Sequence, residues 1–274
     1  RLVGSEMCIR DRQKGEQMKS ELFKNELKTI TSDDIRDFAK VVLDDAPDYF
    51  FKVAASSTGK YHPAYALGDG GLMRHTKAVL RIYNYIIGLE QYQNQFDERW
   101  IDLGRVACLA HDIQKSGTAE IYEEKAKDGK KVFTVFNHPL LAAEYIRNYK
   151  GLYLEDDELE IIADAVSSHM GQWNTSDRES IVLPKPKSQL GKIVHVADYL
   201  ASRKDIDISF KDDTDAYDLP DIETYKCPYK KHKDELLTDV AKTDPEYLEW
   251  LHENVNMREP MKTFVNELLK NKTN

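Results

Sequence analysis

Residues 108–117 read CLAHDIQKSG, and this stretch places two metal-competent side chains next to each other at the end of an apolar run. Adjacent residues on a helix point about 100° apart, so His111 and Asp112 would not share one face of a regular helix. Either both side chains reach the same ion, or His111 caps the helix and Asp112 simply ends it. The choice depends on whether the rest of the chain supplies further ligands.

Helical patterns surround this stretch on both sides. Segments 71–92 and 100–112 carry apolar residues at helical spacing, and 139–149, 158–170 and 189–203 predict three more helices. The period changes over 119–136, where two strand-like runs flank Asp128-Gly129, a favourable hairpin turn. The sequence therefore predicts an all-α helical bundle with one inserted β-hairpin.

Composition narrows the class of protein. The chain has 274 residues, 41% of them apolar, and a net charge of −9, which predicts a soluble globular protein that does not attract nucleic acid through its overall field. A local basic patch could still bind it. The three cysteines, Cys8, Cys108 and Cys227, form no disulfide pattern and predict a reducing, cytoplasmic location. No apolar run is long enough to span a membrane, and the oligomeric state is left open.

The chain divides into five segments by pattern. Residues 1–17 lack periodicity and caps, so we expect a non-native or disordered leader there, with Met18 as a candidate start. The other expected segments are N-terminal helices over 18–58, the main helical body over 59–205, an acidic linker over 206–223 and a small α-rich module over 224–274.

Six of the eight histidines lie in the helical body, and two aspartates there sit in apolar surroundings. Asp198 in VHVADYL and Asp112 after VACLAH would be costly to bury unless paired or ligated. Taken singly, each histidine could be a helix cap or a surface group, and His62 and His195 fit that interpretation. Side chains that converge from facing helices are how bundles build metal sites. The predicted ligands are His75, His111, Asp112, His138, His169 and Asp198.

The order H…HD…H…H…D resembles the HD-domain superfamily of metal-dependent phosphohydrolases. The likeness covers about 59–205 and is carried by YHPAYALGDGGLMRHT, HDIQKSG, FNHP, SSHMG and VHVADYL, in the order found in the HD domain of bacterial 3′-to-5′ exoribonucleases. The resemblance implies that His75, His111, Asp112 and Asp198 hold a first metal. It implies that His138 and His169 hold a second, with Asp112 bridging the two.

Such a centre would hydrolyse phosphate esters through a metal-activated water, because paired divalent ions stabilise the attacking and leaving oxygens. Mn or Fe are the ions to test first, and Mg, Co, Ni or Zn are also compatible with these ligands. Asp112 and Lys115 are the expected catalytic residues, with Lys115 contacting a phosphate oxygen. Arg74 and Arg203 are further candidates for phosphate contacts. The resemblance suggests that His62 shapes the entrance or contacts substrate.

Residues 225–251, YKCPYKKHKDELLTDVAKTDPEYLEWL, resemble the C-terminal module of exodeoxyribonuclease-X-like proteins, with Lys230 and Asp234 where glycines are usual. We expect Tyr247, Leu248 and Trp250 in the core of this module. Lysines beside tyrosines can bind single-stranded nucleic acid, although a plain surface charge run would look the same. The predicted contacts are Lys230, Lys231 and Lys233.

The leading prediction is a phosphomono- or phosphodiesterase that acts on a nucleotide or on single-stranded nucleic acid. One alternative is a di-iron oxygenase of the HD fold, because that branch of the superfamily uses the same six ligands. The other is a non-catalytic protein that binds nucleotides or nucleic acid. The sequence does not choose between RNA, DNA, a nucleotide and a signalling nucleotide.

Overall fold

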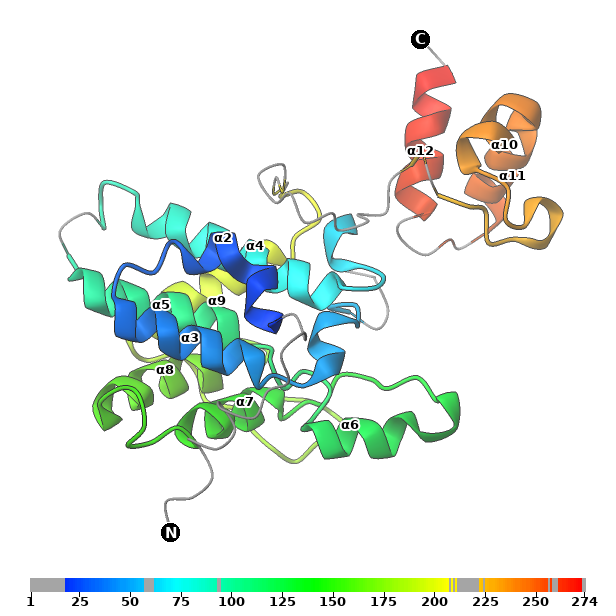
Figure 1. The fold of residues 1–274 in the computed structure, drawn as a ribbon. Coiled ribbons are helices and arrows are strands. Elements are labelled where there is room, and N and C mark those ends of the chain that lie inside the picture. Colours follow the sequence, from blue (N-terminus) through cyan, green and yellow to red (C-terminus); the bar gives the residue numbers. More distant parts are fainter. Residues whose placement is uncertain are drawn as a thin grey trace.

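The structure is a computed structural model that describes residues 18–56, 62–92, 95–206, 208, 210, 222–223, 225–255, 257 and 261–272. Within these ranges the chain is built from α- and 3-10 helices and forms no β-strand (Figure 1). Two isolated bridges, Ser176–Glu179 and Lys226–Leu236, are the β pairing found there. The predicted leader 1–17 and most of the predicted linker 206–223 lie outside the described residues.

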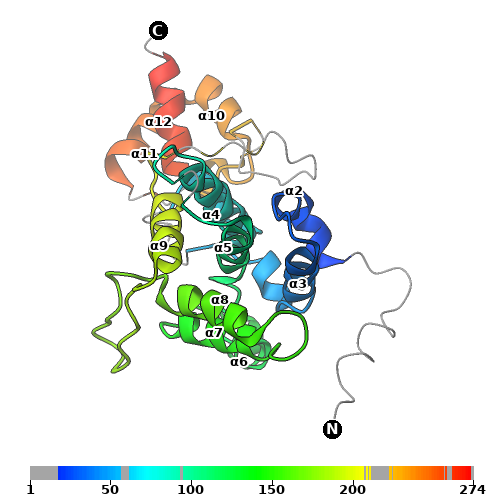
Figure 2. The same ribbon diagram turned by 90° about the vertical axis from the view of Figure 1, so that its left-hand side faces the viewer.

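Five helices form the bundle that carries the predicted ligands. Helix α4 (Gly71–Ile87) packs against α5 (Glu98–Ala110) and α9 (Gln189–Ala201), and α8 (Asp156–Ser168) packs against both α5 and α9. Helix α7 (His138–Arg147) covers α8, so these helices form two layers that are clearest in Figure 2. Helices α5 and α8 therefore each pack against α9 as well as against one another.

Local signals in the sequence fix where these helices begin. The Asp97 side chain accepts a hydrogen bond from the Trp100 N–H (2.7 Å) at the start of α5, and Ser188 accepts from the Gly191 N–H (3.1 Å) at the start of α9. Glu155 forms a reciprocal capping box with Glu158 at the start of α8. Each cap satisfies backbone donors that the first helical turn leaves unpaired.

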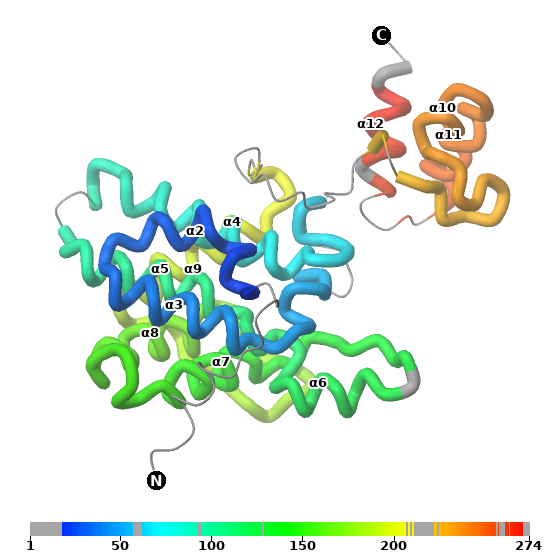
Figure 3. The backbone as a smooth tube through the Cα atoms, in the orientation of Figure 1, coloured from blue at the N-terminus to red at the C-terminus, as the bar shows by residue number. Residues whose placement is uncertain are grey.

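The N-terminal segment shares one core with the bundle. Phe23, Phe38 and Phe50 are fully buried in the same apolar cluster as Leu72 and Leu109. The predicted boundary at 58/59 therefore separates two stretches of sequence that lie in one core. The elements are η1 (Lys19–Phe23), α2 (Lys24–Leu27), α3 (Asp33–Asp44) and η2 (Asp48–Phe51), and Figure 3 traces their path across the bundle.

Polar contacts join this N-terminal segment to the bundle as well. Arg81 of α4 lies 3.0 Å from the buried Glu26 carboxylate. Asp102 of α5 accepts hydrogen bonds from the backbone N–H groups of Thr31 (3.0 Å) and Ser32 (2.8 Å), and so caps α3 from another helix. The start of α3 is thus stabilised by tertiary structure, since Ser32 makes no side-chain capping bond of its own.

The predicted β-hairpin over 119–136 is wrong. Residues Ala119–Ala126 form helix α6, followed by the 3-10 turn η4 (Lys127–Gly129). Thr118 caps this helix by accepting from the Ile121 N–H (3.4 Å), and the run AEIYEEKA is rich in good helix formers. Gly129 does adopt the left-handed conformation expected of a turn (φ 69°), but it ends a helix there.

The C-terminal module has a core of its own, built from residues that include Cys227, Leu237, Leu251 and Val265. Tyr247 and Leu248 are buried in it as predicted, but Trp250 is 52% exposed, so its assignment to the core is wrong. The helical elements are η5 (Lys230–His232), α10 (Leu237–Thr243), α11 (Pro245–Asn254) and α12 (Met261–Lys272).

A bilayer crossing would need a longer and more apolar helix than any in the described part of the chain. Cys108 and Cys227, the cysteines that fall in the described ranges, are buried free thiols.

Candidate metal centre

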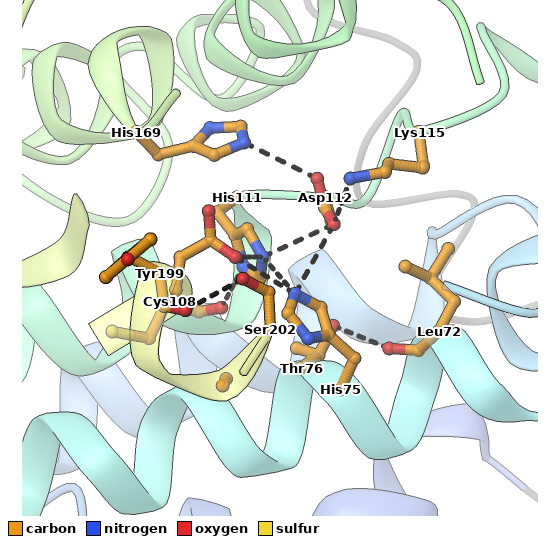
Figure 4. A network of polar contacts seen from close by, with 12 residues as sticks. Leu72, His75, Thr76, Cys108, His111, Asp112, Lys115, His169, Tyr199 and Ser202 are labelled. Carbon is orange, nitrogen blue, oxygen red and sulfur yellow. Dashed lines mark hydrogen bonds and ion pairs between the residues drawn. The ribbon is translucent and has the colours of Figure 1, made fainter. Parts of the chain in front are cut away.

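The six predicted ligands meet at one place between the helices, as Figure 4 shows for His75, His111, Asp112 and His169. Each comes from a different helix or helix end, apart from the adjacent pair after α5. His75 lies in the second turn of α4, His111 and Asp112 directly follow α5, His138 begins α7, His169 directly follows α8, and Asp198 lies in α9.

The two oxygens of Asp112 face different pairs of histidines. Oδ2 lies 3.4 Å from Nε2 of His111 and 3.7 Å from Nε2 of His75. Oδ1 lies 3.1 Å from Nε2 of His138 and 3.5 Å from Nε2 of His169. The arrangement contains two potential metal-binding triads that share this one carboxylate.

Asp198 adds a second carboxylate beside the first of these triads. Its Oδ1 lies 3.1 Å from Nε2 of His75 and 3.8 Å from Nε2 of His111. The first group therefore offers two imidazoles and two carboxylates, and the second offers two imidazoles and the shared carboxylate. Nitrogen and oxygen donors of this kind suit divalent transition metals.

Three of the histidines are held with Nε2 facing the centre. The Nδ1 atoms of His111, His138 and His169 lie 2.7, 2.7 and 2.8 Å from backbone carbonyl oxygens three residues earlier. A carbonyl oxygen can only accept, so each Nδ1 carries the proton and each Nε2 presents a lone pair to the centre. The accepting carbonyls belong to Cys108, Val135 and Val166.

Several polar atoms at the centre are buried without a hydrogen-bond partner among the described residues. They include Oδ1 of Asp112 and Nε2 of both His138 and His169, the same atoms that form the second triad. A buried polar atom without a partner is destabilising by about 1–3 kcal/mol. A cation bound between these three atoms would satisfy all of them, so the residues present fit a metal.

The pKa shifts prepare these groups to bind a cation. Burial, with a smaller effect from Lys115, lowers the pKa of His138 to about 4, so its imidazole is neutral at pH 7. Burial alone would raise the pKa of Asp112, but Lys115 and His111 more than offset it and hold this pKa well below its usual range. Burial would also raise the pKa of Asp198, but the hydrogen bond to His75 and the nearby histidines outweigh this effect and lower the pKa.

Lys115 reaches the centre from the turn after α5. Its Nζ lies 2.8 Å from Asp112 Oδ2, and its side chain is 14% exposed. The hydroxyl of Tyr49 holds this turn by donating to the Gly117 carbonyl (2.5 Å) and accepting from the Ser116 N–H (3.2 Å). Sequence reasoning missed Tyr49, because no local pattern relates it to a turn some 67 residues later.

Two glycines explain how His75 comes to its position. Gly70 precedes α4 in the left-handed conformation (φ 70°), which glycine adopts without strain. A Cβ atom on Gly71 would lie 2.4 Å from the carbonyl oxygen of Ala66, the last residue of η3 (Ala64–Ala66). The glycine pair thus lets the loop pack against the start of α4, one turn before His75.

Arg74 does not lie among the triads. Its guanidinium is buried and donates hydrogen bonds to three backbone carbonyls of the loop before α4. The structure therefore uses this side chain to hold the loop that precedes His75, where the sequence suggested a phosphate contact. The accepting residues are Tyr65 (2.5 Å), Leu67 (2.7 Å) and Asp69 (2.9 Å).

The other predicted substrate contacts lie in three places. The ring of His62 packs edge-on against His75 at 5.4 Å, and burial lowers its pKa to about 3. Arg203 follows α9, with its guanidinium 4.7 Å from the centre of the Tyr199 ring. The C-terminal lysines Lys230, Lys231 and Lys233 are exposed, and Lys231 pairs with Asp244 (2.6 Å).

Comparison with known families supports the resemblance of the helical body to HD domains. Residues 72–203 match the family model of the HD domain, and this range contains all six predicted ligands. Searches of curated proteins and of solved structures gave no match. The match over residues 72–203 supports a place for this part of the chain in the HD-domain superfamily.

Proposed function

We propose that this protein is a two-metal phosphohydrolase, a phosphomono- or phosphodiesterase that acts on a nucleotide or on single-stranded nucleic acid. The observation that carries the proposal is the division of the Asp112 carboxylate between two histidine pairs, with Oδ2 facing one and Oδ1 facing the other. A carboxylate placed in this way can bridge two cations, whereas a helix cap or a surface aspartate would not be buried among four imidazoles.

The proposed ligand assignment follows the two groups. His75, His111, Asp112 and Asp198 would hold the first ion, and Asp112, His138 and His169 the second. Mn and Fe are the first candidates, and Mg, Co, Ni and Zn are compatible with the same donors. Two divalent ions bound there would lower the pKa of a water molecule and stabilise negative charge on the phosphate.

The chain's own residues would bind and orient the ester. Lys115 lies beside Asp112 and is partly exposed, so its ammonium would lie within reach of a phosphate oxygen of an ester bound at the centre. His62 stays neutral and lies against His75, at the edge of the first group. We assign it a contact at the entrance.

The C-terminal module supplies the proposed contacts to a longer substrate. Lys230 and Lys233 are exposed cations that can lie along a nucleic-acid backbone. Lys231 is offset by its ion pair with Asp244, so we expect it to contribute less. If the module binds single strands, salt should weaken binding of an oligonucleotide more than binding of a mononucleotide.

A substrate panel tests the proposed activity. Metal-free protein would be reloaded with Mn²⁺ or Fe²⁺ and incubated with p-nitrophenyl phosphate, bis-p-nitrophenyl phosphate, nucleoside monophosphates and single-stranded oligonucleotides. We expect release of phosphate or nucleotides by the reloaded protein, and loss of that release in Asp112→Ala. The exposed Asp239 of the C-terminal module supplies the matched control, Asp239→Ala, which should stay active.

Two results would contradict the proposal. An Asp112→Ala variant as active as the wild type would remove the role of the shared carboxylate. Iron-loaded protein that consumes O₂ and cleaves no ester would instead support an oxygenase.

A further inference from the structure

A tryptophan, a tyrosine and an arginine form a stack beside the metal centre. Trp173 is 43% exposed and packs nearly parallel to Tyr199, with ring centres 5.3 Å apart and planes inclined by 25°. The guanidinium of Arg203 lies 4.7 Å from the centre of the same tyrosine ring. We call these three side chains the Trp173 stack.

The stack is joined to the metal centre by the turn that follows α8. Gly171 takes up the left-handed conformation there (φ 57°), and a Cβ atom at this position would lie 2.2 Å from Cε1 of His195. His195 in turn donates from Nδ1 to the His169 carbonyl (2.7 Å). The same turn therefore fixes the predicted ligand His169 and brings Trp173 against α9.

The stack lies next to the most exposed of the six ligands. Asp198 has a side chain that is 19% exposed, whereas those of the other five ligands are at most 2% exposed. Tyr199 directly follows Asp198 in α9, and Arg203 lies two residues beyond the end of that helix. The stack therefore contains Tyr199, the chain neighbour of the ligand that is most accessible to solvent.

Two features of the stack point to a ligand that is both planar and anionic. An indole with one face packed on Tyr199 and nearly half of its surface exposed can stack on a further ring. The Arg203 Nε is buried and has no hydrogen-bond partner within the described ranges, so it retains a donor for an acceptor atom of a ligand. Nucleobases stack on aromatic side chains regardless of base identity.

We propose that Trp173 binds the base of a nucleoside phosphate whose phosphate group lies at the metal centre. This inference rests on the proposed phosphohydrolase function and narrows its substrate class to esters that carry a nucleobase next to the reacting phosphate. The base stacks on the exposed face of Trp173, and Arg203 donates to the sugar phosphate. A single-stranded end and a free nucleotide share this chemistry.

Steady-state kinetics with paired substrates test the inference. Adenosine 5′-monophosphate and ribose 5-phosphate carry the same sugar and phosphate, and they differ in the base. With Mn²⁺, Trp173→Ala should lower kcat/KM for the nucleotide about tenfold or more, mainly through KM, and leave ribose 5-phosphate unchanged. Trp173→Phe keeps an aromatic face and should recover most of the loss. Tyr85→Ala removes a tyrosine that is 73% exposed on α4 and should change neither substrate.

The same variants should be assayed with a short single-stranded oligonucleotide. A loss confined to the mononucleotide would assign the stack to free nucleotides, and a loss with both would include strand ends. Equal losses for the nucleotide and for ribose 5-phosphate would overturn the inference, because the residue would then support the metal centre rather than bind a base. An unchanged nucleotide kcat/KM in Trp173→Ala would also overturn it.

Fluorescence keeps the inference testable if no ester is cleaved. The chain has three tryptophans, Trp100, Trp173 and Trp250, and stacking of a base quenches indole emission. Adenosine 5′-monophosphate should quench the wild type and Trp250→Phe but not Trp173→Phe. Quenching without hydrolysis would reject the proposed activity and retain the base site. Quenching that persists unchanged in Trp173→Phe would reject the base site itself.

Discussion

The chain displays two aromatic stacks that look alike and lie in different surroundings. Beside the metal centre Trp173 packs on Tyr199 and Arg203 covers that tyrosine. In the C-terminal module Trp250 packs on Tyr247 at 6.1 Å with planes 14° apart, and Lys231 lies 4.9 Å from the centre of the Tyr247 ring. Both tryptophans are well exposed, at 43% and 52%.

The two stacks differ in whether the cation beside the tyrosine, Lys231 or Arg203, is paired with an acidic side chain. Lys231 is paired with Asp244 at 2.6 Å, and Asp244 also accepts from His232 at 2.9 Å, so the charge there is already compensated. The Arg203 Nε has no such partner within the described ranges, and Trp173 packs against His195, which hydrogen-bonds to the carbonyl of the potential ligand His169. We therefore assign ligand binding to the exposed aromatic pair whose neighbouring cation keeps an unpaired donor, and not to the pair whose cation is already in an ion pair.

The largest expected effect comes from removing a ligand of the second triad. His138→Ala should lower the bound metal from about two ions per chain to about one, and lower phosphohydrolase activity about 100-fold or more, because Asp112 Oδ1 loses its nearest partner. Metal analysis and a nucleotide assay would measure both. His232→Ala in the C-terminal module is the matched control and should change neither, and a full metal complement in His138→Ala would contradict the second triad.

Metal removal should destabilise the bundle and leave the C-terminal module unaffected. An ion present at 100 times its Kd stabilises the folded state by about 2.7 kcal/mol, which corresponds to roughly 5–10 °C in Tm for a domain of this size. Hydrogen exchange with and without Mn²⁺ would localise the effect. We expect faster exchange in α5 and α8 after chelation and no change in α10 and α11. Equal changes in both regions would place a metal in the module as well.

Acid should release the two ions in order. The neighbouring Asp112 raises the pKa of His111 in spite of its burial, whereas burial lowers the pKa of His138 to about 4. A histidine with a higher pKa is protonated at a higher pH, so protons displace the ion of the first triad before that of the second. Bound Mn²⁺ measured as the pH is lowered should fall in two steps, from about two ions to about one and then to none, with the ion of the first triad leaving at the higher pH.

His138→Ala sharpens this experiment because it retains the first triad alone. Its single ion should leave in the first of the two steps, at the higher pH. Retention of that ion until the pH of the second step would show that His111 does not control the acid limit of the first site.

The smallest expected effect concerns the backbone of the C-terminal module. Asp234 adopts a positive φ (68°), which glycine takes up without strain, and it is the one non-glycine residue in the described ranges that does so. Asp234→Gly should stabilise the module by about 0.5–1 kcal/mol in chemical denaturation. Lys230→Gly is the control, because Lys230 lies in a 3-10 turn without positive φ and the same change there should destabilise. Destabilisation by Asp234→Gly would contradict the strain.

Much of the metal centre could be predicted from the sequence because its ligands follow helix starts and ends that local patterns reveal. His111 and Asp112 end an apolar helix, and His138 begins one. The order of the motifs along the chain then predicted that these residues form a single metal centre. Helix α6 was missed because an apparent alternation over 119–136 imitated two strands, although Thr118 and the glutamates after it favoured a helix.

Other features depend on contacts between distant parts of the chain. The sequence suggested a phosphate contact for Arg74, whereas its guanidinium donates hydrogen bonds to backbone carbonyls. These partners could not be predicted, because every residue has a backbone carbonyl whatever its side chain. The packing of Trp173 on Tyr199 depends on the turn at Gly171 and on His195, which the sequence suggested only as a cap or a surface group. Trp250 was predicted to lie in the core of the C-terminal module because Tyr247, Leu248 and Leu251, which are buried there, surround it in the sequence.

The hydrogen bonds of the Tyr49 hydroxyl affect where the chain can be truncated without loss of the metal centre. A fragment cut at the limits of the family match, 72–203, would discard the Tyr49 hydroxyl, which hydrogen-bonds to both Ser116 and Gly117, together with the Glu26 carboxylate that pairs with Arg81. Such a fragment would keep every metal ligand and still expose a large apolar face where η1, α3 and η2 had packed. We expect a stable fragment to begin before residue 72, at the start of η1, because the core of the bundle includes Phe23, Phe38 and Phe50.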